Sequence, residues 1–169
     1  MIVRQKVVAL FVVLMVLWNC APSVAASSSN VGIENFKRTN HYLEGQFKDV
    51  ASDSWYASSV EVGYEMGIIN GSGENTYNPT GNITIAEAVT LAARLHSIYN
   101  TGFADFEQSG IWYQVYVDYA IENGIIGEST YTDYSANATR SQFAVIFAAT
   151  FPHTEFNSIN NIKYGSVPD

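Results

Sequence analysis

Four segments of this chain carry apolar residues at every third or fourth position, with polar turns between them. The stripes consist of Tyr56, Val60 and Tyr64; Ala88, Leu91, Ala92 and Leu95; Tyr113, Val117 and Ile121; and Phe143, Ile146 and Phe147. That spacing places apolar side chains on one face of an α-helix. The pattern therefore predicts an all-α fold built from four amphipathic helices.

Helix-boundary signals frame the four segments. Gly67 and Gly124 follow the first segment of each pair, at the position where a left-handed C-cap residue is favoured. The second segment of each pair opens on a capping box, in which a Thr hydroxyl accepts from the third amide while a Glu or Gln side chain reaches back. The capping-box residues are Thr84 with Glu87 and Thr139 with Gln142. Each box is worth about 1 kcal/mol to its helix.

The two helix pairs belong to a repeat whose copies lie 57 residues apart. Four landmarks recur in order: Phe47-Lys48-Asp49, Trp55-Tyr56, Gly67-Ile68-Ile69 and Thr84-Ile85-Ala86-Glu87, then Phe103-Ala104-Asp105, Trp112-Tyr113, Gly124-Ile125-Ile126 and Thr139-Arg140-Ser141-Gln142. Trp to Gly is 12 residues in both copies, and Trp to Thr is 29 in one and 27 in the other. We expect two tandem helix–loop–helix units, each with too little apolar surface to fold alone.

Residues 1–26 have the layout of a secretory signal, because two cations precede an apolar run of 12 at residues 7–18 and small residues follow. Twelve residues rise about 18 Å as a helix, less than the roughly 20 residues that a membrane span needs. This length favours a cleaved signal over an uncleaved anchor, and Cys20 lies in only a loose lipobox. We expect a secreted protein whose mature N-terminus lies near Ser27.

The cysteine count and the net charge limit what can hold this protein together and what it can bind. Without residues 1–26 the chain has no cysteine, so burial and not disulfides must hold it together. It then carries 6 Lys and Arg against 16 Asp and Glu, a formal charge of −10. Such a surface repels nucleic acid and anionic lipid, which excludes both as partners. We expect no membrane contact once the signal is removed.

No residue pattern indicates catalysis or a cofactor. His41, His96 and His153 have no metal-ligand spacing, and the loop at 70–81 lacks the carboxylates at fixed offsets that a calcium loop needs. No cysteine remains to act as a nucleophile, and no pair of Asp or Glu residues stands out for glycoside hydrolysis. We expect a protein that is not an enzyme and that binds no cofactor or metal.

Five residues are open to a binding role as well as a structural one. Arg140 lies just inside a helix start, where the dipole disfavours a cation, so it either binds an anion beside the free amides or is simply solvated. Trp55 and Trp112 either pack against the fold or offer a face on which a sugar ring stacks. Asp49 and Asp105 either cap the backbone or accept hydrogen bonds from sugar hydroxyls.

The landmarks Phe-x-Asp, Trp-Tyr, Gly-Ile-Ile and a Thr-Arg-Ala-Glu-like tetrapeptide resemble the S-layer homology domain of bacterial surface proteins. The resemblance covers residues 47 to about 152 as two copies. Members of that family usually carry three copies, which pack as a pseudo-threefold bundle of helices with grooves between neighbours. The resemblance implies that these grooves bind pyruvylated secondary cell-wall polysaccharide, and that the chain anchors an exported protein non-covalently to the wall at the surface of a bacterial cell.

The resemblance also assigns roles to individual residues. The family's anion-binding arginine corresponds to Arg140 in the second copy, whereas Ile85 takes its place in the first copy and cannot pair a carboxylate. The change Ile85→Arg is therefore expected to add affinity if the first groove is otherwise intact. The other polysaccharide-binding positions would be Asp49, Asp105, Trp55, Trp112, Gly67 and Gly124.

These features predict a division of the chain into five parts. They are a signal peptide at 1–26, a lead-in at 27–46, a first repeat at 47–100, a second repeat at 101–152, and a linker with the start of an incomplete third repeat at 153–169. Val167-Pro168-Asp169 stands where the third Phe-x-Asp would be. The incomplete third repeat keeps a second hypothesis open, in which the chain is a structural or assembly module of the surface layer that associates with other repeats or chains and binds no glycan.

Overall fold

All regular structure in the described part of the chain is helical. The computed structural model describes residues 30–108 and 110–156, and within them it has no β-strand, so the predicted all-α class is confirmed. The elements are η2 (Ile33–Asn35), α2 (Ala57–Glu65), α3 (Ile85–Thr101), α4 (Gln114–Glu122), α5 (Arg140–Ala148) and η3 (His153–Glu155). The predicted signal at 1–26 and Val167-Pro168-Asp169 lie outside the described residues. None of the described helices is long and apolar enough to cross a membrane.

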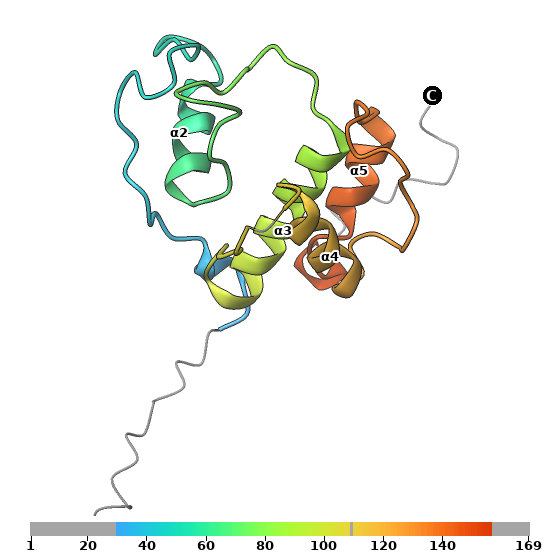
Figure 1. Ribbon diagram of the computed structural model, residues 1–169. Helices are drawn as coiled ribbons and strands as arrows, with labels where there is room; N and C mark the ends of the chain where they lie inside the picture. The colour runs from blue at the N-terminus through green and yellow to red at the C-terminus, as the bar shows by residue number, and fades with distance from the viewer. Residues whose placement is uncertain (1–29, 109, 157–169) are drawn as a thin grey trace, which may run out of the picture.

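Helix α3 packs against both α4 and α5, which lie beside it in Figure 1. Ala88 and Ala92 of α3 are fully buried, and their small side chains let the neighbouring helices approach closely. The buried cluster consists of Ile85, Ala88, Val89, Ala92, Val117, Ala120, Ile125, Ile126 and Ile146. One core therefore joins residues of both predicted repeats.

Helix α2 belongs to a smaller cluster of its own. The buried members of that cluster are Phe47, Val50 and Val60, and the rings of Tyr42, Tyr64 and Tyr77 lie 6.0, 5.9 and 5.9 Å from the Phe47 ring. Within the described residues no other helix packs against α2. Figure 1 shows α2 apart from the group formed by α3, α4 and α5.

The lead-in segment joins the last turns of α3 and α2. The amide of Gly32 and the side chain of Asn35 donate to the carbonyl of Tyr99, at 3.0 and 2.8 Å, near the end of α3. Further along, the amides of Thr39 and Asn40 donate to a carbonyl at the end of α2, at 2.8 and 2.9 Å. These bonds satisfy carbonyls that have no partner inside either helix.

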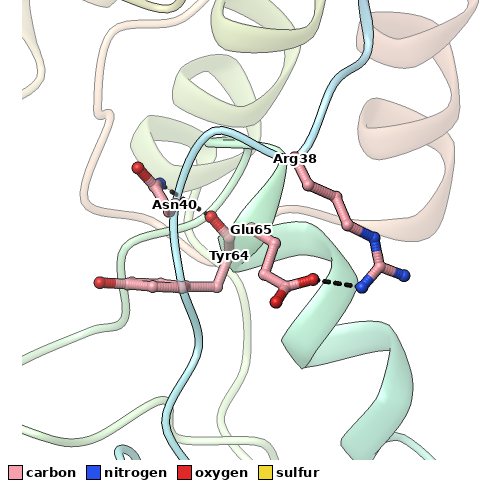
Figure 2. A network of polar contacts seen from close by, with 4 residues as sticks. All are labelled: Arg38, Asn40, Tyr64 and Glu65. Atoms are coloured by element: carbon pink, nitrogen blue, oxygen red, sulfur yellow. Dashed lines mark hydrogen bonds and ion pairs between the residues drawn. The ribbon is translucent and has the colours of Figure 1, made fainter.

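Side chains strengthen the contact at the end of α2. Figure 2 shows Arg38 in an ion pair with the carboxylate of Glu65, and the side chain of Asn40 donating to the carbonyl of Tyr64 at 2.9 Å. Both partners of the lead-in lie in the last two residues of the helix. The segment before the first landmark is therefore part of the fold, although only η2 is helical within its described portion, residues 30–46.

Both capping boxes are formed. In the first, Thr84 Oγ1 accepts from the Glu87 amide at 3.2 Å, and the Glu87 carboxylate accepts from the Thr84 amide at 2.7 Å. Thr139 and Gln142 make the same pair of bonds at 3.3 and 2.8 Å. Helices α3 and α5 begin directly after these threonines, as the sequence predicts.

The turns after α2 and α4 contain Gly67 and Gly124, with φ of +72° and +70°. In both turns the amide that follows the glycine donates back across the last helical turn at 2.8 Å. This is the Schellman arrangement, in which a left-handed residue ends the helix. In the described structure these glycines therefore terminate α2 and α4, and their predicted part in polysaccharide binding stays a prediction.

The loop before α5 covers the start of α3. The amides of Ile85 and Ala86 donate to the carbonyls of Ala136 and Tyr134, both at 2.9 Å, so the second predicted repeat satisfies the first amides of α3. Among residues 30–108 and 110–156, no equivalent loop covers the first amides of α5. The two helix starts are therefore in different surroundings.

Candidate functional site

A groove of about 680 Å³ lies between α3, the loop at 68–83 and the segment that leads into α4. Three aromatic side chains line it, Tyr77, Trp112 and Tyr116. Its polar lining residues are Asn70, Ser72, Asn78, Asn82, Glu87, Thr90, Arg94 and Gln108. Aromatic faces beside many hydrogen-bonding groups suit a polar, ring-shaped ligand.

The two predicted platform tryptophans have different surroundings. Trp112 is 51% exposed and lines the groove, with its ring edge-on to Tyr113 at 5.5 Å. Trp55 is 90% exposed and lies edge-on to Tyr56 at 5.5 Å. The packing interpretation is therefore wrong for Trp55, and Trp112 is half packed and half open.

Trp55 lies at a second pocket, of about 430 Å³, which is mainly apolar. That pocket is lined by residues of α2, α3 and α5, among them Val60, Leu91, Phe143 and Phe147. It offers few hydrogen-bonding groups to a sugar, and the rings of Phe143 and Phe147 stack on one another at 4.2 Å. Its chemistry suits an apolar partner better than a glycan.

Asp49 holds the groove loop in place. Its carboxylate accepts from the amides of Tyr77 and Asn78, at 2.9 and 2.6 Å. The hydrogen bond from Tyr77 is the main reason that the pKa of Asp49 lies below its usual value, and the bond from Asn78 lowers it further. These contacts match the capping interpretation of Asp49.

Asp105 differs from its counterpart in the first copy. It is exposed, and no described residue donates a hydrogen bond to its carboxylate or forms an ion pair with it. It does not line either pocket. Since no described donor occupies its carboxylate, Asp105 can accept from a ligand outside the groove.

Arg140 and Ile85, the first residues of α5 and α3, are also in different surroundings. Arg140 is exposed and lines neither pocket, so the structure does not bring it together with Trp112. Ile85 is 3% exposed and belongs to the core, because the loop before α5 closes over the start of α3. Ile85 is therefore a packing residue, and the described structure has no open anion position in its place.

Arg94 is a groove residue that the sequence interpretation missed. It is 9% exposed, and its Nε donates to the Gly67 carbonyl at 2.9 Å. Its Nη2 reaches the same carbonyl and Asn70 Oδ1, and Nη1 reaches the Tyr116 hydroxyl at 3.4 Å. A signal was present in the sequence, because a cation three residues after Leu91 falls beside the apolar stripe, where a charge is unexpected.

Other polar groups near α3 have structural partners. Glu87 lines the groove, but its carboxylate accepts from the amide and hydroxyl of Thr84. His96 lies with Nδ1 2.9 Å from the Tyr119 hydroxyl, and burial lowers its pKa. In the described part of the chain no group of three His, Cys, Asp or Glu side chains could hold a metal ion.

Comparison with known proteins agrees with the landmarks of the first copy. Residues 46–89 match the model of the S-layer homology domain. The matched segment includes Asp49, Trp55, Gly67 and the first capping box, and it supplies the loop wall of the groove. The second copy and the start of a third stay predictions.

Curated relatives share a longer stretch with this chain. It is 30% identical over 118 residues to the surface-layer 125 kDa protein of Lysinibacillus sphaericus, which is 64% of this chain and 10% of that protein. It is 32% identical over 113 residues to an amylopullulanase of Thermoanaerobacterium thermosulfurigenes, which is 60% of this chain and 6% of the enzyme. It is 31% identical over 113 residues to the exoglucanase XynX of Acetivibrio thermocellus, which is 60% of this chain and 10% of that protein. The chain thus spans a tenth or less of these relatives, and no solved structure matches it.

Proposed function

We propose that this chain anchors an exported protein non-covalently to the bacterial cell wall by binding pyruvylated secondary cell-wall polysaccharide. The observation that carries the proposal is the groove, because the segment that matches the S-layer homology domain forms one of its walls and Trp112 lines it. The half-open indole offers a face to a sugar ring, and the polar lining offers partners for hydroxyls.

The comparisons support anchoring over catalysis. The shared stretch recurs in a surface-layer protein and in two proteins named as different enzymes, and it covers only a small part of each. Proteins with such different names are most simply explained as sharing this segment for a common property, such as attachment to the cell wall. We therefore propose that the chain contributes no catalytic group of its own.

Two exposed residues outside the groove are proposed as further contacts. Asp105 would accept from a sugar hydroxyl, and Arg140 would pair with an acidic substituent elsewhere on the polymer, beside the uncovered first amides of α5. Arg140→Ala should lower the affinity for the polysaccharide by about 1.5–3 kcal/mol, the scale of a charged hydrogen bond. It should leave the free energy of unfolding unchanged or slightly higher, since it removes a cation from a helix start. Urea denaturation and calorimetric titration of one preparation measure both quantities.

A second candidate function is assembly with other chains. It is favoured by the apolar pocket beside Trp55 and by the absence of any helix packed against α2 within the described residues. In this alternative a further repeat, from this protein or from another, covers that face and no glycan is bound.

Co-sedimentation with isolated bacterial cell walls separates the two candidates. Walls of Lysinibacillus sphaericus, the source of one relative, are a suitable substrate. The proposal expects the chain to sediment with intact walls and to remain in solution once mild acid has removed the pyruvate ketals. Sedimentation with neither wall preparation would favour the assembly function, and equal sedimentation with both would mean that the chain attaches to the wall without recognising pyruvate.

A further inference from the structure

Arg94 is a buried cation without an anionic partner. All the acceptors that the described structure gives its guanidinium are neutral: the Gly67 carbonyl, the Asn70 amide oxygen and the Tyr116 hydroxyl. No described carboxylate forms an ion pair with it, whereas the exposed Arg38 has one in Glu65. Buried charges in proteins are usually paired, because neutral hydrogen bonds offset only part of the cost of removing the charge from water.

The guanidinium also has hydrogen-bonding capacity to spare. An arginine has five N–H donors, and the described bonds use one from Nε, two from Nη2 and one from Nη1. The Nη1 bond to Tyr116 is long, at 3.4 Å. An anion at Nη1 would find one unused donor and a second that is only weakly engaged.

Thr90 supplies a second unsatisfied group on the same helix face. Its hydroxyl is buried and has no hydrogen-bond partner among the described residues. Thr90 and Arg94 are four residues apart on α3, which places them one turn from each other, and both line the groove. A buried hydroxyl without a hydrogen-bond partner lowers the stability of the protein. A ligand oxygen that accepts from the hydroxyl removes that cost.

The lining of the groove carries one residue of each charge sign. Glu87 is the one acidic residue among its lining residues, and its carboxylate is engaged in the capping box of α3. Arg94 is the one basic lining residue. Arg94 lies seven residues, about two helical turns, beyond Glu87 on α3, so the potential at the Arg94 end of the groove is more positive than at the Glu87 end.

We propose that Arg94 and Thr90 form the carboxylate-binding end of this groove, so that the groove takes an acidic substituent of the glycan while Trp112 stacks on the sugar. This inference rests on the proposed function. It assigns anion recognition within the groove to two residues in the middle of α3, in a copy whose helix start carries Ile85 and not an arginine. The carboxylate would accept from Nη1 of Arg94 and from the Thr90 hydroxyl.

Arg94 also has a structural role, since it links α3 to the turn after α2 through Gly67. The test must therefore separate recognition from folding. Thr90→Val removes the hydroxyl with little change of shape. It should leave the free energy of unfolding unchanged or higher, because that hydroxyl has no hydrogen-bond partner among the described residues. Lys48→Gln is the matched control, because it removes an exposed cation that lines neither pocket.

The measurement is the affinity of the full chain for cell-wall polysaccharide, intact and after mild-acid removal of pyruvate, by calorimetric titration. For the parent, removal of pyruvate should weaken binding by about ten- to a hundredfold. Arg94→Gln should lose a large part of that factor on the intact polymer, and removal of pyruvate should weaken it less than it weakens the parent, because only the contact of Arg140 with an acidic substituent is left. Thr90→Val should show a smaller loss, again confined to the intact polymer, and Lys48→Gln should behave as the parent.

Equal losses on both polymers for Arg94→Gln would mean that Arg94 acts only through the fold, and would overturn the inference. If Arg94→Gln does not fold, the test rests on Thr90→Val. The inference would then be overturned if Thr90→Val had the same ratio of affinities for the intact and the pyruvate-free polymer as the parent. A parent that binds both polymers equally would overturn the inference and leave wall attachment standing. A parent that binds neither polymer nor intact walls would overturn the proposed function itself.

Discussion

Corresponding residues of the two predicted copies do different things in this structure. Trp112 has one face open to a groove lined by polar groups, whereas Trp55 is almost fully exposed beside an apolar pocket. Asp49 holds a loop through two amides, whereas Asp105 has no such partner among the described residues. Sequence likeness between copies therefore does not transfer a binding role from one to the other.

Trp112→Ala should lower the affinity for cell-wall polysaccharide by about two- to tenfold, since aromatic stacking is worth about 0.5–1.5 kcal/mol beyond area burial. Trp55→Ala is the matched control, because it removes the same side chain from outside the groove. Calorimetric titration with the purified polymer measures both. An equal loss for the two variants would contradict the choice of groove.

His96 should make stability depend on pH below neutrality. Burial lowers its pKa below the usual 6.5, so the unfolded chain takes up a proton at a pH where the folded chain does not. The free energy of unfolding should fall as the pH drops below about 6.5, and His96→Gln should reduce that slope. Urea denaturation between pH 5 and 8 tests this, and an unchanged slope in the variant would exclude His96 as its source.

The helices were predictable from sequence because their signals are local. Each capping box spans four residues and each glycine acts within one turn, so Thr84, Thr139, Gly67 and Gly124 could be given their roles without a fold. The partners of Asp49 and Arg94 lie 22 to 29 residues away, and no spacing rule reaches that far. A local rule could not predict that the start of α3 is buried and the start of α5 is exposed either. The burial of α3 depends on the loop before α5, which belongs to the other predicted copy.

The substitution Ile85→Arg tests whether the start of α3 is buried, as the structure has it, or open to a ligand, as the sequence suggests. The sequence suggests a gain of binding, but the side chain is 3% exposed in the core beside Val89 and Ala88. An unpaired buried charge should lower the free energy of unfolding by at least about 2 kcal/mol. Ile85→Val is the control and should cost about 0.5–1.5 kcal/mol. Chemical denaturation of both variants measures the difference, and an Arg variant as stable as the parent would place this residue on the surface.

At the scale of the whole molecule, the described residues form two clusters of unequal size. The larger joins α3, α4 and α5, and the smaller surrounds α2. The lead-in and Arg94 connect α2 to α3 by hydrogen bonds and not by helix packing. The groove lies along this connection, so its width depends on how firmly the two clusters are held.

Hydrogen exchange should resolve the two clusters. Amides of α2 should exchange faster than those in the middle of α3, because fewer buried apolar contacts hold α2 in place. Addition of cell-wall polysaccharide should slow the exchange of α2, since a ligand in the groove contacts both clusters. Equal protection of α2 and α3 in the free protein would contradict this division.

The most direct test of the central claim is to locate the bound polymer on the protein by NMR. Titration with short fragments of cell-wall polysaccharide should shift the indole Nε1–H of Trp112 and the amides of the loop at 68–83, and should leave the indole of Trp55 unchanged. Shifts confined to Trp55 and α5, or none at saturating fragment, would contradict the account.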